Sequence, residues 1–404
     1  MNVLHIATID RGGAFKAAER FHQSLLRRGI NSRILVRTAS CGSEVEICFQ
    51  NRLEELVSKG KNFINRLVSR GEIFRDLFGT DISTNEYVQE ADVLVLHWFN
   101  SFLSVKSLEK LFALNKPMVF MMHDMWLFTG GCHVAGDCKK YRDECGACPL
   151  ISSEKDMDIS YQNFRDKEIL FEHNNAVITG PSLWIVECAK QSPILKKQRV
   201  EYIPNMIDTQ VFRPVKDRDA LRKKYGLPEG KKIILFGAAD RGTGNRNKGF
   251  AYLSRAVQEL DPEQYHLVIF GNTGADLGIS DIYGRTLLGY VEKEAQMAEI
   301  YNLANVYVTP SLQESFGFTV CEALACGTPV VAFPVGGILD QIVHEQNGYL
   351  AKLKDVEDLK KGIIYCIENE NILREKAREG AKRFSFEAVG DVYAEFLQKI
   401  CEEQ

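Results

Sequence analysis

Residues 309–337 constrain the fold of this chain more than any other stretch, because they hold a short helix with its own start and stop signals between two apolar runs. The stretch reads TPSLQESFGFTVCEALACGTPVVAFPVGG and follows the apolar run at 306–308. Apolar patterning predicts strands at 306–308 and 330–333 and a helix over about 318–326, which Gly327 caps and Pro329 stops. The pattern predicts a strand–helix–strand unit of an α/β fold.

The start of this helix carries the first functional signal. Ser315 and Gly317 lie where main-chain N–H groups lack partners within the helix, and Gly317 allows a ligand to approach the backbone. This favours an anion site, most naturally for a phosphate. Glu314 and Glu322 flank the site with seven residues between them. On one helix they would lie roughly 80° apart, so a carboxylate pair on a shared face is not predicted.

Residues 314–330 resemble the E-x7-E signature of retaining glycosyltransferases of the GT-B fold, in particular family 4, also called glycosyl transferases group 1. The resemblance implies an α/β protein of two Rossmann-like, doubly wound domains facing across a cleft. It also implies that Glu314 lies near the donor sugar and that Glu322 binds the nucleotide ribose. The diphosphate would be bound by the amides that follow Glu314, at Ser315, Phe316, Gly317, Phe318 and Thr319. The alternative is an ordinary βαβ unit with surface carboxylates.

The chain length of 404 residues suits two domains of about 150–200 residues each. Residues 204–208 read PNMID and resemble the turn that joins the domains in this family, although Met206 stands where Gly is usual. We expect an acceptor-side domain over 1–203 and a nucleotide-sugar-binding domain over 204–383. The last segment, 384–404, resembles the terminal helix that returns to the first domain.

Composition excludes several classes of protein. A net charge of −4 gives no electrostatic case for nucleic acid, and no apolar run approaches the 18 or more residues that a membrane span needs. The first residues, MNVLHIATIDRGG, lack the pattern of a secretory signal. We expect a cytoplasmic protein whose 11 cysteines, an odd number, form no disulfide framework.

Two positions in the first half are candidates on the resemblance. Gly13 follows a buried strand at 3–9, in a turn into a helix expected over about 14–28, and the family places this loop opposite the donor. His123 follows the strand at 118–122, at the carboxyl end where open α/β sheets bind ligands. Its segment HDMWLFTGGCH resembles a subgroup that builds polysaccharides, in which this His contacts the donor sugar. Taken alone, Gly13 reads as a tight turn and His123 as a structural group.

Residues 51–78 form a basic amphipathic segment, with apolar residues at helical spacing and Lys59, Lys61 and Arg66 between them. One interpretation is a helix whose apolar face packs on the sheet and whose polar face is solvated. The other is contact with the cytoplasmic face of an anionic membrane, or with a lipid-linked acceptor.

Four cysteines, Cys132, Cys138, Cys145 and Cys148, lie within 17 positions, and the last two form a C-x2-C pair. Four thiolates suit a closed tetrahedral zinc site, although the first two are separated by five residues, more than is usual. Reduced thiols without a metal, and disulfide or redox chemistry, stay open as alternatives. Asp156-Met157-Asp158 resembles a metal-binding DxD triplet, but its polar surroundings predict a solvated loop.

The loop after the strand at 233–237 is rich in Gly and cations. The family places an Arg directly after the strand and a Lys before the next Gly. Lys248 matches the second position, whereas Ala238 occupies the first, which leaves Arg246 or Arg241 as substitutes. Such cations stabilise charge on a departing diphosphate. By the same resemblance, Gly271 and Tyr290 frame the base.

The sequence therefore predicts a retaining hexosyltransferase that moves a sugar from a UDP or GDP donor to a saccharide or lipid-linked acceptor, in cell-surface polysaccharide biosynthesis. Glu314, Lys248 and His123 are the expected catalytic residues, and no metal or other cofactor is expected to be required for catalysis. The alternatives are a nucleotide-sugar epimerase or hydrolase of the same fold, and a catalytically degenerate sugar-nucleotide-binding partner.

Overall fold

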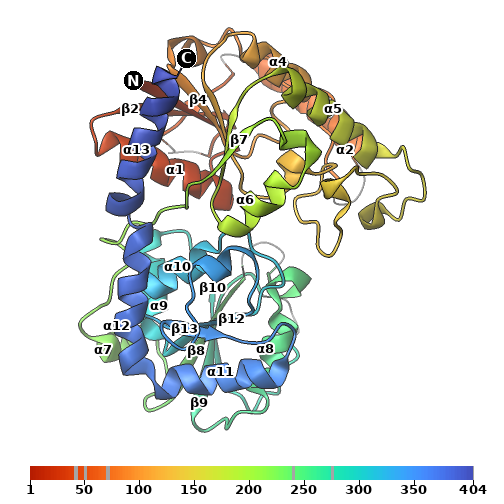
Figure 1. Ribbon diagram of the computed structural model, residues 1–404. Helices are drawn as coiled ribbons and strands as arrows, with labels where there is room; N and C mark the ends of the chain where they lie inside the picture. Colours follow the sequence, from red (N-terminus) through yellow and green to blue (C-terminus); the bar gives the residue numbers. More distant parts are fainter. Residues whose placement is uncertain (41–43, 50–51, 70–72, 239–241, 274–276, 404) are drawn as a thin grey trace. The chain divides into compact units, whose positions relative to one another are not determined.

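A computed structural model describes residues 1–403 apart from 41–43, 50–51, 70–72, 239–241 and 274–276 (Figure 1). The chain divides into two compact units. The first unit is Met1–Met206 together with Val389–Gln404, and the second is Ile207–Ala388. Each unit is built on its own parallel sheet.

The sheet of the first unit has the strand order β3-β2-β1-β4-β5-β6-β7 within the described residues. All neighbouring strands run parallel. Strands β4 and β5 are buried along their whole length, as expected where helices cover both faces of a sheet. The strands are β1 (Asn2–Ile9), β2 (Asn31–Thr38), β3 (Glu46–Ile47), β4 (Val93–Leu96), β5 (Met118–Met121), β6 (Val177–Gly180) and β7 (Arg199–Tyr202).

Helices pack on this sheet through apolar faces, and Figure 1 shows α4 lying beside α5. Ser104 caps α4 and Ser182 caps α6 with their hydroxyls, as their side-chain chemistry favours. The helices of the first part of the chain are α1 (Gly12–Leu26), α2 (Arg52–Val68), α3 (Glu86–Glu90), α4 (Val105–Phe112), α5 (Ile159–His173) and α6 (Leu183–Lys190).

Helix α2 corrects the first interpretation of the basic amphipathic segment. Its large apolar side chains are exposed, and its buried residues are polar, Ser58 at 5% and Asn65 at 3% exposure. The Asn65 side chain bonds the main chain of Phe78 in both directions, at 2.8 and 3.0 Å. The helix is therefore fixed by polar contacts and presents its apolar residues to solvent, namely Leu56, Val57, Phe63, Ile64 and Leu67.

The second unit contains a six-stranded sheet in the described residues, with the order β10-β9-β8-β11-β12-β13 and parallel pairing throughout. Apolar clusters fill both faces, one around Tyr301 and the other around Phe236. The strands are β8 (Lys232–Ala238), β9 (Tyr265–Gly271), β10 (Arg285–Gly289), β11 (Val306–Thr309), β12 (Val330–Ala332) and β13 (Gly348–Leu350).

The helices of the second unit confirm the strand–helix–strand pattern of residues 306–333, and two of them, α7 and α12, were not predicted from the sequence. They are α7 (Arg218–Lys224), α8 (Phe250–Val257), α9 (Glu294–Leu303), α10 (Phe318–Ala325), α11 (Val356–Glu368) and α12 (Glu370–Ala381).

The last helix, α13 (Phe386–Glu402), belongs to both units, because its residues from Val389 onward pack in the first. The ring of Tyr393 lies 4.5 Å from that of Phe21 on α1, and Asp391 pairs with Arg28. Arg199, in β7, pairs with Glu403. This end of the chain therefore completes the hydrophobic core of the first unit.

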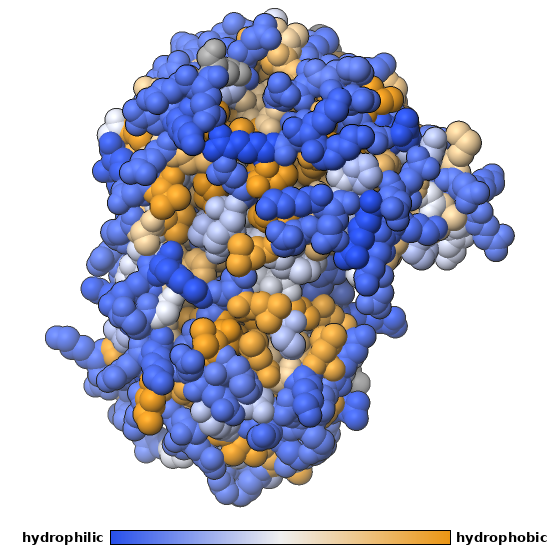
Figure 2. All heavy atoms as spheres, in the orientation of Figure 1, coloured by the Kyte–Doolittle hydropathy of each residue, from blue (hydrophilic) through white to orange (hydrophobic). Residues whose placement is uncertain are grey.

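On the face drawn in Figure 2, both units carry a mostly hydrophilic surface with smaller hydrophobic patches, in keeping with a charged fraction of 26%. None of the helices in the described ranges is long and apolar enough to span a membrane. No disulfide joins the cysteines of the described part.

Candidate active site

The order of the second sheet reverses between β8 and β11, and the two charged candidates lie in the loops that follow these strands. Lys248 is in a short 3-10 helix, η6 (Arg246–Lys248), and its ammonium group donates to Oε1 of Glu314 in an ion pair. The Ser311 hydroxyl donates to the same oxygen at 3.3 Å. The point where strand order reverses is where open α/β sheets bind ligands, so the structure brings these two predicted residues together at the expected place.

Gly249 explains why a Gly follows the Lys. Its φ is +69°, and a Cβ there would lie 1.8 Å from the Pro310 carbonyl oxygen. The Leu312 N–H donates to the Asn247 carbonyl at 2.8 Å. The two loops are thus joined along their main chains, and this seam positions Lys248 against Glu314.

A second pair of glycines, Gly336 and Gly337, lies against the main chain of the loop at Glu314. The Gly337 N–H donates to the Glu314 carbonyl at 3.0 Å, and a Cβ on Gly336 would lie 1.8 Å from that carbonyl oxygen. Gly317, with φ of +89°, is the N-cap of α10. Loop and helix start are therefore held in one conformation, which turns the positive end of the α10 dipole toward the loop.

The other predicted diphosphate-binding positions have mixed exposure. Phe316 is buried at 3% exposure and packs edge-on against Phe318, with ring centroids 5.2 Å apart. The Thr319 hydroxyl bonds the Tyr307 phenol, and Ser315 is half-buried. Because the Phe316 side chain is buried, only the main chain at this position is suited to contact a ligand, as the resemblance implies.

Glu322 is nearly enclosed, at 3% exposure, and accepts a hydrogen bond from the Tyr301 hydroxyl at 3.0 Å. Burial and the adjacent carboxylate raise the pKa of Tyr301 well above its usual value, so the phenol stays a donor. Tyr301 was not singled out in the sequence, because its position within α9 reads as ordinary core.

The remaining donor-side positions lie along the same edge of the sheet. Gly271 ends β9 with φ of +93° and pairs in register with Ala238 at the end of β8. Tyr290 follows β10 and is 68% exposed. Arg246 is exposed. Arg241, the other predicted substitute for the missing cation, lies outside the described residues.

In the first unit the strand order reverses between β1 and β4, and His123 is part of a buried histidine chain near this point. His5 Nδ1 lies 2.9 Å from His97 Nε2, and His97 Nδ1 lies 2.9 Å from His123 Nε2. Burial lowers the pKa of His5 to about 3. Burial also lowers the pKa of His123 to about 4, although the nearby charge of Asp124 acts to raise it. All three imidazoles are neutral at pH 7.

Gly13 lies in the first turn of α1 and is exposed. The helix begins two residues earlier than predicted, and it is Gly12, with φ of +84°, that makes the turn. A Cβ on Gly13 would meet no atom within 4 Å. The described contacts therefore give no steric reason for glycine at this position.

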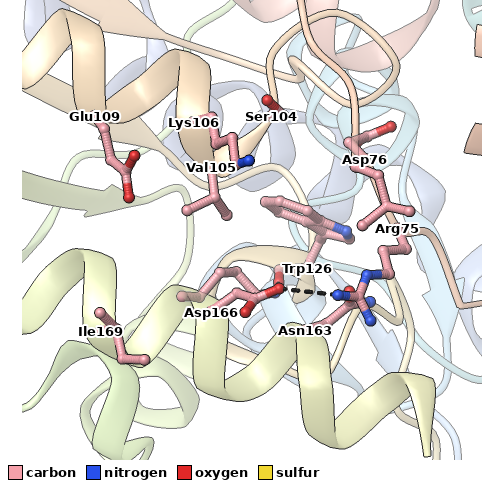
Figure 3. Close-up of a pocket in the computed structure, with 12 residues that line it drawn as sticks. Arg75, Asp76, Ser104, Val105, Lys106, Glu109, Trp126, Asn163, Asp166 and Ile169 are labelled. Carbon is pink, nitrogen blue, oxygen red and sulfur yellow. Dashed lines mark hydrogen bonds and ion pairs between the residues drawn. The ribbon is translucent and has the colours of Figure 1, made fainter. Parts of the chain in front are cut away.

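An open cavity of about 340 Å³ lies in the first unit between α4 and α5, and Figure 3 shows the residues that line it. Trp126 lies at its centre, Val105 and Lys106 project from the α4 side, and Arg75 pairs with Asp166 of α5. The buried ammonium of Lys167 lies 4.0 Å from the Trp126 ring centroid and donates to the Trp126 carbonyl. An aromatic ring among polar and charged side chains suits a polyhydroxylated ligand.

The four clustered cysteines line one small cavity in the first unit. The Gly130 N–H donates to Cys145 Sγ at 3.2 Å, and the Leu150 and Ile151 N–H groups donate to Cys148 Sγ. Burial nevertheless raises the pKa of Cys132 and Cys148, and that of Cys145 to about 12. As the side chains stand, no group of three or more His, Cys, Asp or Glu among the described residues is arranged to hold a metal ion.

In the Asp156–Asp158 loop, Asp156 and Met157 are exposed as the prediction of a solvated loop has it, whereas Asp158 is not. Asp158 is 8% exposed and caps α5 by accepting from the N–H groups of Ser160 and Tyr161. Its other oxygen accepts from the Cys148 N–H at 2.8 Å. These contacts occupy Asp158 in joining the cysteine loop to α5.

Comparison with known proteins places these observations in a family. Residues 217–384 match the model of glycosyl transferases group 1. This match covers less than half of the chain, and over its range the chain is similar to the glycosyl transferases group 1 family. The matched range holds the Lys248–Glu314 pair, α10 and Glu322, so the family predicted from the E-x7-E pattern is confirmed.

Curated relatives match through about half of their length. A D-inositol 3-phosphate glycosyltransferase of Xylanimonas cellulosilytica is 31% identical over 223 residues, which cover 50% of this chain and 52% of the relative. An N-acetyl-alpha-D-glucosaminyl L-malate synthase of Bacillus anthracis is 27% identical over 203 residues, or 48% of this chain and 52% of the relative. The chain thus spans about half the length of the curated relatives it matches.

Solved structures match over the whole chain. HepE of Anabaena in complex with UDP and glucose gives a TM-score of 0.68 at 17% identity, covering 99% of this chain and 100% of HepE. Sucrose-phosphate synthase of Thermosynechococcus elongatus gives 0.68 at 17% identity, covering 100% of both chains. The predicted GT-B fold, with two Rossmann-like α/β units, is confirmed.

Proposed function

We propose that this protein is a retaining glycosyltransferase that moves a sugar from a nucleoside-diphosphate donor, UDP- or GDP-linked, to a saccharide or lipid-linked saccharide acceptor. The observation that carries the proposal is the Lys248–Glu314 pair at the reversal point of the second sheet, next to the N-terminus of α10. Such a place suits a diphosphate, because a fixed ammonium and a helix dipole both favour negative charge there. The resemblance of the segment around His123 points to polysaccharide biosynthesis.

Each residue then has a role. Lys248 and the main chain of residues 315–319 hold the diphosphate and stabilise the charge that develops as the nucleotide leaves. Glu314 accepts from sugar hydroxyls, Glu322 binds the ribose, and Gly271 and Tyr290 frame the base. Gly13 and Arg246 are secondary donor-side positions. Because a lysine supplies the positive charge, catalysis needs no metal.

The geometry favours departure and attack on one face of the sugar. Glu314, the carboxylate paired with Lys248, is already engaged by Lys248 and Ser311. A nucleophile for double displacement is therefore not indicated, and the departing phosphate can take the acceptor proton. His123, neutral and partly exposed, contacts the reacting sugar in this proposal.

The cavity around Trp126 is the proposed acceptor site (Figure 3). Its lining holds three cations and three acids, which suits a neutral saccharide better than a polyanion: Arg75, Lys106 and Lys167, and Asp76, Glu109 and Asp166. The cavity also adjoins the segment that carries His123, since Trp126 donates its main-chain N–H to Asp124 at 2.8 Å.

Calorimetric titration with UDP and GDP, without added metal, tests the proposal. We expect one nucleotide to bind to the wild type and to bind at least about tenfold more weakly to Glu322→Gln, which keeps the shape of the side chain and an acceptor for Tyr301. Lys376→Ala, an exposed lysine of α12, is the matched control and should bind as the wild type does. Absence of binding to either nucleotide at millimolar concentration would contradict the donor site.

Product analysis separates the transferase from its alternatives. A transferase consumes the sugar nucleotide faster when acceptor is present, whereas a hydrolase or epimerase needs none. A degenerate binding partner binds the nucleotide and releases no product with any acceptor.

We also propose that Cys132, Cys138, Cys145 and Cys148 hold a structural zinc ion. Their common cavity and the N–H groups directed at two of the sulfurs support this, since thiolate ligands of zinc accept such bonds. Zinc would have to displace thiol protons and reorient side chains, so binding and local folding are coupled. Metal analysis of the purified protein tests this, and less than about half an equivalent of zinc would count against it.

Helix α2 is the proposed contact with an anionic membrane surface. Phe63 and Leu67 are 63% and 67% exposed, and Lys59 on the same helix is also exposed. Co-sedimentation with vesicles of phosphatidylglycerol and phosphatidylcholine should fall for Phe63→Ser with Leu67→Ser, relative to Ile372→Ser, which removes an exposed apolar residue of α12. Equal sedimentation of all three proteins would exclude this contact.

A further inference from the structure

Three histidines from neighbouring strands form one continuous hydrogen-bonded chain in the first unit. His5 lies within β1, His97 directly follows β4, and His123 follows β5 by two residues. These strands are adjacent in the sheet, in the order β1-β4-β5. Both N–N distances in the chain are 2.9 Å. Each strand therefore contributes one imidazole to a row that begins in the core and ends at the candidate site.

The chemistry of the imidazole ring couples these three side chains. A neutral imidazole carries one N–H donor and one lone-pair acceptor, so His97 donates at one end and accepts at the other. The whole row can run in only two directions. If His5 donates to His97 and His97 to His123, then His123 Nε2 accepts and its proton is on Nδ1. If the row runs the other way, His123 Nδ1 becomes an acceptor.

The inner end of the chain favours the first direction. His5 Nε2 is buried and has no hydrogen-bond partner in the described part of the chain. A buried N–H without a partner is rare in proteins, so this nitrogen is better left as a lone pair. The nearby phenol of Tyr393, whose ring centroid is 6.4 Å from that of His5, is likewise buried without a partner there. A lone pair on His5 Nε2 is compatible with this neighbouring phenol, because a phenol O–H is a hydrogen-bond donor.

The surroundings keep the row neutral. The charged or titratable groups that face it are His22 of α1 and Tyr393 of α13 at the inner end, and Asp124 at the outer end. His5 and His97 are both almost fully buried, at 0% and 3% exposure, and burial lowers the pKa of each. A proton added to Nε2 of His97 or His123 would leave two donors facing each other at a junction, and one added to Nε2 of His5 would create a buried N–H without a partner in the described residues.

We propose that His5 and His97 are positioning residues that hold His123 as the neutral Nδ1–H tautomer, so that the outer nitrogen of His123 donates a hydrogen bond to the reacting sugar nucleotide. The arrangement of the row stands on the structure alone, while the ligand that receives the bond rests on the proposed function. In this arrangement His123 is a fixed dipole and does not take a proton during the reaction. The expected acceptor of the hydrogen bond from His123 is a hydroxyl or phosphate oxygen of the sugar nucleotide.

The tautomers can be read directly by nuclear magnetic resonance of the full chain labelled with ¹⁵N-histidine. We expect His5, His97 and His123 to stay neutral from pH 7.5 to about 5.5, with His123 protonated on Nδ1. His344, whose side chain is exposed, provides a reference signal from outside the row. Protonation of His123 between pH 7.5 and 5.5, or an Nε2–H tautomer at His123, would overturn the proposal.

Variants then test the coupling along the row. His97→Phe should convert His123 to a mixture of tautomers, whereas His97→Gln, which can both donate and accept, should restore the Nδ1–H form in part. His344→Asn is the control and should leave the His123 signals unchanged. If His97→Phe does not fold, His5→Phe breaks the inner junction and should have the same direction of effect. An unchanged His123 in a folded variant would refute the coupling.

Kinetics separates this inference from the proposed function. If the protein transfers sugar, His97→Phe should lower kcat by about 10- to 100-fold with a change in donor KM of less than about threefold, because the misplaced group acts in the transition state. If the wild type turns over no sugar nucleotide, the proposed function fails, and the tautomer measurement still decides whether the row exists. A normal kcat in a folded variant with mixed His123 tautomers would remove the catalytic part of the inference.

Discussion

The candidate residues of the two units occupy similar places in their sheets, but they are charged in one unit and neutral in the other. Both place their candidate residues near the point where the order of a parallel sheet reverses, within β1 and after β4 and β5 in the first unit and after β8 and β11 in the second. The second unit uses full charges, the Lys248–Glu314 pair, on a seam of main-chain contacts. The first uses a row of neutral imidazoles buried in the sheet.

The difference teaches how each site responds to its ligand. A charged pair with partial exposure is ready to exchange one partner for a diphosphate, since Lys248 is 31% exposed and remains solvated on one side. A buried neutral row cannot exchange partners without leaving an unpaired polar group in the core. The second unit is thus suited to bind charge, and the first to orient one hydrogen bond.

Removing Lys248 should have the largest effect. We expect Lys248→Ala to lower turnover on the order of 10²-fold with the fold retained, because one fixed donor to the developing charge is lost. The measurement is kcat with the nucleotide identified by calorimetry, with Lys376→Ala as the control. Activity within a few-fold of the wild type would place the charge stabilisation elsewhere.

Substitution of Gly249 should have the next largest effect, because it separates position from charge. In Gly249→Ala, the added Cβ would meet the Pro310 oxygen, so the seam must open while Lys248 itself is kept. We expect donor binding to weaken about tenfold and the free energy of unfolding to fall by about 1–3 kcal/mol. Gly244→Ala, in the same loop but with open space around the added Cβ, is the matched control for calorimetry and denaturation. Unchanged binding in Gly249→Ala would mean that the seam does not position Lys248.

Acid should destabilise the first unit through its histidines. The pKa of His5 is lowered to about 3 and that of His123 to about 4, both below the value of about 6.5 in an unfolded chain. The unfolded state therefore binds more protons as pH falls below about 6.5, and stability falls by about 1.4 kcal/mol per pH unit for each such histidine, until the folded pKa is reached.

Tryptophan fluorescence can follow this loss, since all three tryptophans, Trp98, Trp126 and Trp184, lie in the first unit. Urea unfolding at pH 7.5, 6 and 5 should show the decline, and His5→Leu should make it shallower. A first unit equally stable at pH 7.5 and pH 5 would contradict the neutral row.

Removal of metal ions by a chelator should have the smallest effect. It tests whether the positive charge of the second unit comes from Lys248 rather than from a metal ion. We expect EDTA to change nucleotide binding by the second unit less than about twofold, because Lys248 supplies the positive charge. If the cysteines hold zinc, a stronger chelator such as phenanthroline should lower the thermal stability of the first unit without changing nucleotide affinity. Loss of nucleotide binding in EDTA would show that a metal ion takes part in the donor site.

The sequence predicted the elements that are set by local patterns. The strand, loop and helix around Gly317 follow from alternation and from two glycines, and the structure has them as β11, α10 and β12. Helix α12 was missed because the break at Asn369 between α11 and α12 involves neither Gly nor Pro. The reversed packing of α2 could not be predicted, since it depends on the contact of Asn65 with Phe78, which lies outside the helix and 13 residues further along the chain.

The candidate site shows the same limit. Lys248 and Glu314 were found because each belongs to a short motif, although they are 66 positions apart. His5 was missed because VLHIA reads as an apolar strand, and its partner lies 92 residues away. A histidine inside a buried strand was the available signal, since the N–H of a buried imidazole needs an acceptor.

Helix α13 also bears on how this protein is made. Because residues 389–404 are part of the first unit, the core around Phe21 and Tyr393 cannot close until the second unit has been synthesised. While some 180 further residues are synthesised, at about 5–20 residues per second, the nascent first unit therefore lacks the helix that covers one flank of its core. A chaperone that shields that flank would raise the yield of the whole chain more than stabilising the second unit would.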